Sequence, residues 1–333
     1  MMIDIGAHIM PKKYCDALYA LHLPKFNLKD VIETLPTMVD LDHRFRIMDK
    51  FDGLMQVLTL SAPAVEEFSD SEKSPDFARL ANDSMAELVL KYPDRFAAAV
   101  ACVPMNNIDA ALEEIDRAVN DLKFRGIQVN TPINDKPLDA PEFMPIYEKM
   151  SQYHLPIWIH PMRTVDFADY RTEKKSKYMI FHVFGWPYET AAAMTRLVFS
   201  GVFEKYQNLT FITHHSGGMV PFLAERIIGA YDHAEMLRGA QYKQGLTRAP
   251  IDFFRNSFYN DTAIYGNAPA LMCTHAFCGA EHMLFGTDFP YDSQFGERYI
   301  RQTIEAIEQM DIDEGEKRKI FEDNARKILR LPI

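Results

Sequence analysis

The feature that most constrains the fold is a repeated alternation of short apolar runs with amphipathic helical segments. Apolar runs rich in β-branched residues occur at eight places, residues 3–8, 54–60, 96–103, 126–130, 156–160, 209–215, 258–263 and 283–288. Apolar residues at helical spacing lie between most of them, in residues 74–92, 107–122, 140–153, 188–206 and 297–310. Strands that alternate with helices predict a parallel sheet, and eight such units in 333 residues predict a (β/α)8 TIM barrel.

The competing architecture is an open doubly wound sheet. Such a sheet usually carries a glycine-rich phosphate turn after its first strand, and "IDIGAHIMPKKY" has no GxGxxG. We therefore expect one barrel domain over residues 1–333. Residues 11–45 are too long for a simple loop and predict a lid or insertion after the first strand, and residues 313–331 predict a closing helix.

Composition removes several classes of function. The formal net charge is −11, so a basic nucleic-acid-binding face is not expected. The apolar runs are shorter than the ~18 residues of a membrane span. No secretory signal pattern is visible, and the four cysteines show no CxxC spacing. We expect a reduced, cytoplasmic protein that acts on a small molecule and binds neither nucleic acid nor membrane.

Histidine and aspartate residues stand at the ends of four predicted strands. His8 ends the first strand, His160 the fifth and Asp288 the eighth, whereas His214 and His215 end the sixth. In a barrel the carboxyl ends of the strands meet at one mouth. A set of imidazole and carboxylate groups there could bind a divalent ion through N and O ligands, although a single histidine after a strand is more often a hydrogen-bonded structural residue.

The motifs around these residues have a family resemblance. "IDIGAHIMP", "LPIWIHP", "THHSGGMVPFLAERI" and "FGTDFPY" resemble the amidohydrolase superfamily, in the branch that contains aminocarboxymuconate-semialdehyde decarboxylase and related aromatic-acid decarboxylases. The resemblance runs along the whole chain and includes "FGWPYETA", "GVFEKYQNL" and "NARKILRL". The motifs are fairly specific for this branch but not for a substrate.

The resemblance implies a mononuclear metal site. Members of the branch usually hold one Zn²⁺, sometimes Mn²⁺, and by position the ligands here would be His8, His160 and Asp288. His215, before "SGG", would be the catalytic histidine, whereas His214 is expected to point to the opposite face by strand alternation. The fourth strand, "GIQVNTP", lacks the lysine that bridges two ions in binuclear relatives.

Gly6 departs from the family pattern, because it occupies the place of the first ligand of the usual pair on the first strand. Asp4 lies on the same face one layer deeper, where hydrogen bonding inside the barrel is its expected role. Two alternatives stay open. In the first, three protein ligands hold the metal and leave positions for water or substrate. In the second, the site has lost its metal.

Three further residues are candidate substrate contacts. Arg226 matches an arginine that reaches the substrate carboxylate in relatives, often from a neighbouring subunit, which would imply a homodimer; the alternative is an exposed helix arginine. Arg163 is a second candidate anion contact. Trp186 could stack on an aromatic substrate or anchor its loop. The arginine that the decarboxylase itself uses after the first strand has no obvious match, so its own substrate is not expected here.

Three functions remain from these residues. The preferred one is non-oxidative decarboxylation of an aromatic or conjugated carboxylic acid, with the metal as Lewis acid and His215 or Asp288 as proton donor. The alternative is metal-dependent hydrolysis of a C–N, C–O or C–C bond in a small carboxylate. The third is a non-catalytic barrel that has lost its metal, which Gly6 favours and the retained polar strand ends oppose.

Overall fold

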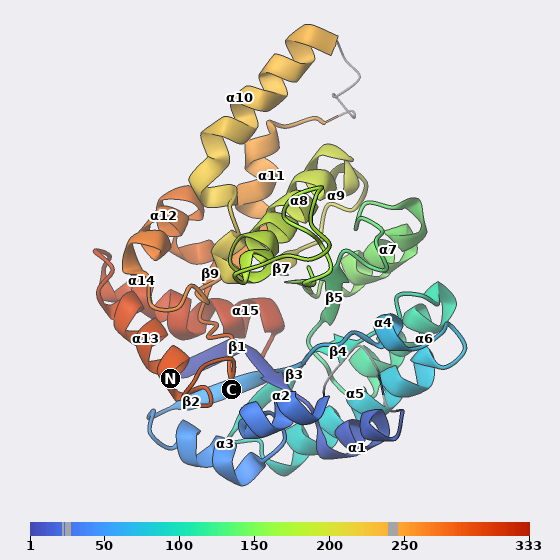
Figure 1. Cartoon of the computed structure of the whole chain (residues 1–333). Coiled ribbons are helices and arrows are strands. Elements are labelled where there is room, and N and C mark those ends of the chain that lie inside the picture. Colours follow the sequence, from blue (N-terminus) through green and yellow to red (C-terminus); the bar gives the residue numbers. More distant parts are fainter. Residues whose placement is uncertain (22, 24–27, 239–245) are drawn as a thin grey trace.

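Parallel strands with helices packed around them form the body of the molecule (Figure 1). The computed structural model describes residues 1–21, 23, 28–238 and 246–333. Within these residues the strands are β1 Met2–Ile9, β2 Leu54–Leu60, β3 Phe96–Ala99, β4 Ala101–Cys102, β5 Ile127–Thr131, β6 Ile157–Pro161, β7 Phe211–Thr213, β8 Phe258–Asp261 and β9 Met283–Leu284. All eight predicted strand positions are confirmed.

Hydrogen bonds close these strands into one barrel. β1–β2–β3 and β4 to β9 form two parallel sheets. β3 and β4 are one strand that changes partner at Val100, because the Val100 N–H donates to β2 and the Ala101 N–H donates to Gly126 before β5. On the other side, Ile5 N–H donates to Phe285 and His8 N–H donates to the Phe289 carbonyl, both beyond β9. The predicted (β/α)8 barrel is therefore confirmed.

Helices follow most strands and cover the outside of the barrel. They are α4 Val65–Phe68, α5 Ser74–Lys91, α6 Ile108–Asn120, η2 Pro141–Phe143, α7 Met144–Tyr153, η3 Phe181–Gly185, α8 Trp186–Phe199, α9 Val202–Lys205, η4 His215–Gly217, α10 Val220–Arg238, α11 Pro250–Asn256, α12 Ala268–Cys278, η6 Ala280–His282 and α13 Glu297–Glu308. The helix predicted over residues 188–206 is interrupted at Gly201, whose φ of +78° suits glycine and ends the α-helical run.

The predicted closing helix consists of three consecutive segments, α14 Glu314–Arg318, the π-helical η7 Lys319–Asp323 and α15 Asn324–Leu329. Asp313 caps α14 by accepting from the Glu316 N–H at 2.9 Å. Ala325 and Leu329 of α15 pack against Ile3 and Trp158 at the bottom of the barrel. The closing segment thus fills the end of the barrel opposite the strand carboxyl ends.

Residues 11–45 form short helices beside β1 and β2 (Figure 1), namely α1 Lys12–Ala20, α2 Leu28–Thr34, η1 Pro36–Met38 and α3 Leu41–Met48. Met10 N–H donates to the Met38 carbonyl, which holds the segment against the end of β1. Its role as a lid and the single-domain extent of residues 1–333 stay predictions. Residues 22 and 24–27 of this segment lie outside the described residues.

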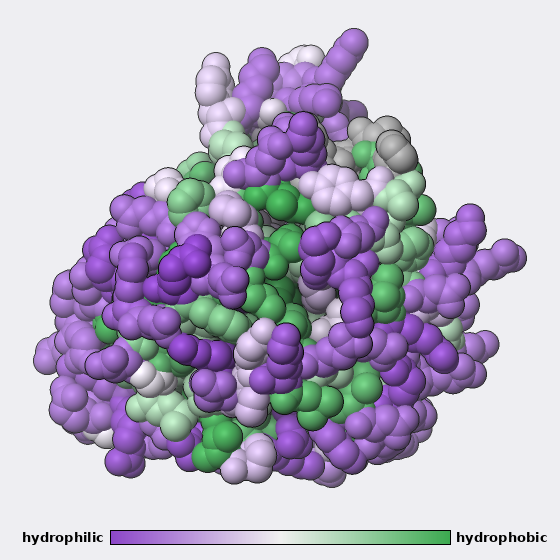
Figure 2. All heavy atoms as spheres, turned by 90° about the horizontal axis from the view of Figure 1, so that it is seen from below, coloured by the Kyte–Doolittle hydropathy of each residue, from purple (hydrophilic) through white to green (hydrophobic). Residues whose placement is uncertain are grey.

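The outer surface is mainly polar, and Figure 2 shows hydrophobic residues gathered in a central strip of one face between polar margins. No helix in the described ranges is both long and apolar enough to span a membrane. The four cysteines are free thiols.

Candidate metal centre

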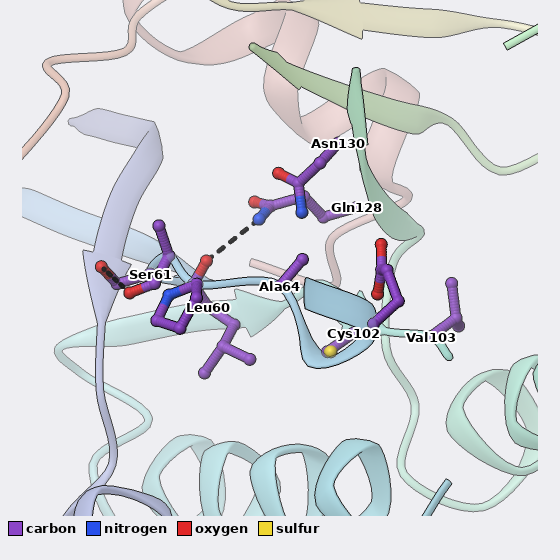
Figure 3. Close-up of a pocket in the computed structure, with 10 residues that line it drawn as sticks. Leu60, Ser61, Ala64, Cys102, Val103, Gln128 and Asn130 are labelled. Carbon is purple, nitrogen blue, oxygen red and sulfur yellow. Dashed lines mark hydrogen bonds between the residues drawn. The ribbon is translucent and has the colours of Figure 1, made fainter. Parts of the chain in front are cut away.

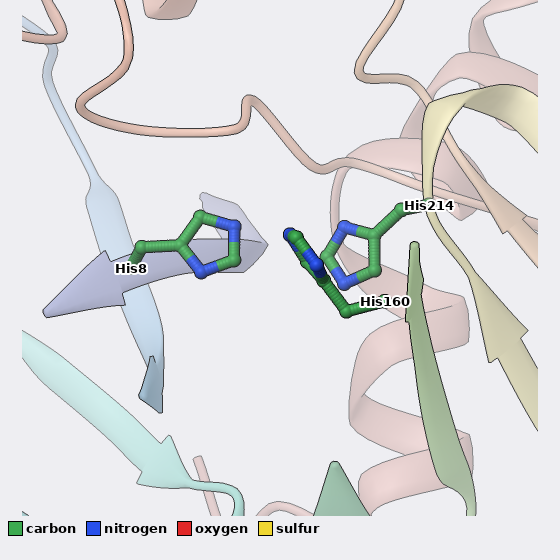
Figure 4. A group of neighbouring side chains, drawn as sticks. All are labelled: His8, His160 and His214. Carbon is green, nitrogen blue, oxygen red and sulfur yellow. The ribbon is translucent and has the colours of Figure 1, made fainter. Parts of the chain in front are cut away.

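Three histidines from three strands meet at the carboxyl ends of the barrel. His8 lies on β1, His160 on β6 and His214 directly after β7. One ring nitrogen of each lies within 4.8 Å of the others, and the rings point toward one another (Figure 4). We call His8, His160 and His214 the His cluster. All three are buried, with at most 5% of each residue exposed.

Asp288 joins this group at the ring nitrogen of His8 that faces the cluster. Its Oδ1 lies 3.2 Å from His8 Nε2, and its Oδ2 lies 3.7 Å from His215 Nε2. The Tyr265 hydroxyl donates to Oδ2 at 3.1 Å. Burial opposes the negative charge, but the nearby His215 and His8 imidazoles hold the pKa of Asp288 well below its usual value. Asp288 is therefore an anion at neutral pH.

The buried polar atoms here fit a bound divalent ion. His8 Nε2 faces Asp288 Oδ1 at 3.2 Å and His214 Nδ1 faces Asp261 Oδ2 at 3.4 Å, but neither pair forms a well-aligned hydrogen bond, and His214 Nε2 is buried with no hydrogen-bond partner in the described part of the chain. Buried polar atoms without a partner are uncommon in native proteins. A cation would satisfy His8 Nε2, Asp288 Oδ1 and one nitrogen of His214, and this N/O donor set suits zinc and manganese alike.

The surroundings of the His cluster favour the neutral form of its imidazoles. Burial, together with the charges of neighbouring histidines, lowers the pKa of His160 and of His214 well below the usual value. Both are therefore neutral at pH 7, which is the form that binds metals. For His215, burial also opposes the charge, but the Asp288 carboxylate prevails and raises the pKa of the imidazole.

The expectation that His214 points away from the site is wrong. His214 keeps an extended backbone, so it shares the inward face of Ile212, two residues before it. His215 has a φ of +55° and leaves the strand, and its ring still lies beside the site, 6.5 Å from that of His160. Both histidines are brought to the site. The assignment of catalysis to His215, and of metal binding to His8, His160 and Asp288, stays a prediction.

Gly6 and Asp4 lie below the His cluster on β1. A Cβ at Gly6 would face His214 Cε1 at 3.9 Å and backbone atoms of Gly286 and Asp288 at 3.8 Å, so there is room for a side chain directed at the cluster. Asp4 accepts hydrogen bonds from Gly6 N–H at 3.1 Å and from Thr287 N–H and Oγ1–H at 3.0 and 2.6 Å. The expected structural role of Asp4 is supported, and burial raises the pKa of its carboxyl to about 6.

Two residues that sequence reasoning did not assign hold His8 in place. Thr59 Oγ1 lies 3.1 Å from His8 Nδ1, which leaves Nε2 directed at the cluster. Arg44, fully buried on α3, donates to the His8 carbonyl and to Gln56 Oε1, each at 2.8 Å, and stacks on Phe289. The sequence did not predict a role for Arg44 because this residue lies close to a predicted helix, and no spacing pattern distinguishes Thr59.

The three residues predicted to contact the substrate lie at different places relative to the His cluster. Trp186 lies against the site, with ring centroids 5.6 Å from His160 and 5.9 Å from His215, and its indole N–H donates to the Arg163 carbonyl. The Arg163 guanidinium instead pairs with Glu189 at 2.7 Å. Arg226 is exposed on α10 and forms no ion pair with another described residue. Within one chain, Trp186 is thus the predicted substrate contact that lies in the site.

Comparison with known proteins gives consistent matches along the chain. The family model described as amidohydrolase matches residues 3–331. A gamma-resorcylate decarboxylase from Polaromonas sp. (strain JS666) is 31% identical over 310 residues, covering 91% of each chain. A 2-amino-3-carboxymuconate-6-semialdehyde decarboxylase from Dictyostelium discoideum is 27% identical over 88% of this chain and 77% of its own. The crystal structure of a dihydroxybenzoic acid decarboxylase from Polaromonas sp. JS666, with bound manganese and 2-nitroresorcinol, is 28% identical, has a TM-score of 0.82 and covers 99% of this chain and 96% of its own.

Proposed function

This chain belongs to the amidohydrolase family, as its motifs predicted, and on that premise we propose that it is a metal-dependent carboxy-lyase. It would remove CO₂ without oxidation from an aromatic or conjugated carboxylic acid. The observation that carries the proposal is the group of buried imidazole and carboxylate atoms at the barrel mouth that lack well-aligned hydrogen bonds within the described residues. The chain also aligns over 91% of its length with a gamma-resorcylate decarboxylase.

We propose that His8, His160 and Asp288 hold one divalent ion, with His214 as a further donor in place of a side chain at Gly6. When bound, the ion would act as a Lewis acid on the substrate carboxylate and a neighbouring oxygen. The sequence favoured zinc over manganese. The manganese in the solved relative favours manganese for this chain too.

His215 is the proposed proton donor. Asp288 Oδ2, 3.7 Å from its Nε2, stabilises the protonated imidazole. When the bond between the ring carbon and the carboxyl carbon breaks, its electron pair stays on the ring carbon, which takes the proton from His215 Nε2, and CO₂ leaves. Trp186 would form one wall for a flat substrate, since its ring lies beside both His160 and His215.

We propose that two copies of the chain join through the face near η3 and α10. Large apolar side chains are exposed there, with 90% of Tyr178, 62% of Phe184 and 81% of Phe222 accessible. α10 extends away from the barrel (Figure 1), so its Arg226 could reach a partner subunit's site. A dimer in light scattering, lost in Phe222→Ser, supports this; a monomer at micromolar concentration contradicts it.

The test of the function measures metal content and product together. Purified protein is analysed for zinc and manganese by mass spectrometry, then assayed for CO₂ release from gamma-resorcylate and related hydroxylated aromatic acids. We expect about one ion per chain and CO₂ release that chelation abolishes. Gly6→His should tighten metal binding by about tenfold or more by adding a ligand. Incorporation of ¹⁸O from water without CO₂ release would instead support the hydrolase alternative, and a metal-free protein that binds metal only as Gly6→His would overturn both.

A further inference from the structure

A second polar pocket opens beside the His cluster. It is formed by residues 60–64 at the end of β2, by Glu66 on α4, by Cys102 and Val103 at the end of β4, and by Gln128 and Asn130 on β5 (Figure 3). The free space between these residues is small, about that of one water molecule, and part of it opens to solvent. None of these side chains has a role in the chemistry proposed above.

The pocket shares a wall with the metal centre. Asn130 pairs in register with His160, so both side chains point into the barrel. Gln128 lies two residues earlier on β5 and shares the same face. On the other side, the hydroxyl oxygens of Ser61 and Tyr291 are 2.5 Å apart, and the Tyr291 ring centroid is 5.4 Å from that of His8. A substrate held at the His cluster could therefore extend a substituent into the pocket.

Glu66 is the unusual residue of this pocket. Only 7% of it is exposed, and among the described residues it forms no ion pair. Tyr14, Cys102 and Glu67 are the titratable groups near it, and none of them supplies positive charge. Burial raises the pKa of its carboxyl to about 8, so at neutral pH Glu66 carries a proton and can donate a hydrogen bond.

Gln128 supplies the complementary acceptor. Its Nε2 donates to the Leu60 carbonyl at 3.0 Å, which fixes the amide and leaves Oε1 buried without a partner (Figure 3). A buried acceptor without a partner costs free energy that a ligand donor would recover. Glu66 and Gln128 thus offer a donor and an acceptor to the pocket, and no residue that lines it is a cation.

We propose that Glu66 and Gln128 form a substrate subsite for an uncharged hydroxyl substituent, separate from the carboxylate held at the metal centre. The hydroxyl would accept from the Glu66 carboxyl group and donate to Gln128 Oε1. A second carboxylate would face the Gln128 oxygen without a cation to compensate it, and a methyl group would leave both partners unsatisfied. This inference rests on the proposed function, since it assumes a hydroxylated acid bound at the His cluster.

Calorimetric binding to the manganese-loaded full chain tests the subsite at pH 6.5. The ligands are 2-hydroxybenzoate derivatives that carry either a hydroxyl or a methyl group at ring position 3, 4 or 5. For at least one position, we expect the hydroxyl form to bind about tenfold more tightly than the methyl form. In Glu66→Leu this ratio should fall to about one, whereas Glu66→Gln, whose amide N–H can donate, should keep it.

Further variants keep the test decisive. Gln128→Met removes the acceptor and should also abolish the preference, which covers the case in which Glu66→Leu does not fold. Glu67→Gln, the neighbouring residue on α4, should leave it unchanged. Raising the pH from 6.5 to 9 ionises Glu66, so the wild type should lose the preference while Glu66→Gln retains it. A preference that is absent in the wild type, or that survives in Glu66→Leu or at pH 9, overturns the subsite.

Parallel CO₂ measurements separate the two proposals. CO₂ release without a hydroxyl preference overturns the subsite alone. A hydroxyl preference in binding without CO₂ release supports the subsite and overturns the decarboxylase. If no ligand binds, both are overturned.

Discussion

Two buried polar clusters lie four residues apart on β1, and they are built in opposite ways. The carboxylate of Asp4 is satisfied by the protein, with three hydrogen bonds from Gly6 and Thr287. The His cluster, one layer nearer the mouth, leaves His8 Nε2 and both nitrogens of His214 without a well-aligned hydrogen bond to another described residue. Both contact the segment after β9, since Asp4 accepts from Thr287 and His8 Nε2 lies 3.2 Å from Asp288 Oδ1.

The difference separates a structural from a ligand-binding use of buried polarity. A fully satisfied network stabilises one arrangement, whereas unsatisfied atoms cost stability until a ligand completes them. The Asp4 cluster should therefore affect the free energy of unfolding and not metal content. The His cluster should affect metal content and activity with a smaller effect on the apo fold.

Removing one member of the His cluster should have the largest effect and tests directly whether this cluster, unlike the Asp4 cluster, binds the metal. His160→Ala should lose the bound ion and lower kcat for CO₂ release by about 10³-fold or more, because the Lewis acid and its template are lost together. The free energy of unfolding of the metal-free protein should fall by less than the about 3 kcal/mol expected for Asp4→Ala, since His160 loses ring contacts with His8, His214 and Trp186 but no side-chain hydrogen bond to a described residue. Metal analysis, kinetics and urea unfolding measure these three quantities.

His154→Asn is the matched control, because His154 is exposed after α7, at the opposite end of β6 from His160, and asparagine tolerates its φ of +52°. It should keep both metal and activity. If His160→Ala retained stoichiometric metal, the His cluster would not be the metal centre.

The second change tests the satisfied cluster. Asp4→Ala leaves the Thr287 N–H and hydroxyl buried without an acceptor, and it should lower the free energy of unfolding by about 3 kcal/mol. Where the variant folds, metal content per chain should remain near that of the wild type. Urea unfolding and mass spectrometry measure the two effects.

Asp16→Ala provides the control on the surface. Asp16 pairs with Lys12 in an exposed i,i+4 arrangement, so its removal should cost less than about 0.5 kcal/mol. An Asp4→Ala variant that lost its metal at unchanged stability would reverse the roles assigned to the two clusters.

The same contrast explains what the sequence could and could not predict. Strand positions followed from apolar periodicity, and His8, His160 and Asp288 from their place at strand ends, because a barrel brings those ends together. The orientation of His214 was missed because β7 ends at Thr213 and the backbone turns at His215, so counting alternate positions back from His215 assigned the wrong face. Arg44 and Thr59 were missed because they act on His8 from other elements, through contacts between residues distant in sequence.

Thr59 lies between the two kinds of cluster, and its substitution gives the smallest expected effect. Its hydroxyl is the side-chain partner of His8 Nδ1, at 3.1 Å, and both residues are buried. Thr59→Val keeps the shape but removes the hydroxyl, so His8 loses the contact that orients its ring toward the cluster. We expect the metal to bind about tenfold more weakly, as is typical when a residue that orients a metal-binding histidine is lost. Competition with a chelator measures the affinity. Thr59→Ser should keep the affinity of the wild type, because serine retains the hydroxyl. If the threonine methyl group had a purely structural role instead, Thr59→Val would keep the wild-type metal affinity and Thr59→Ser would lower it.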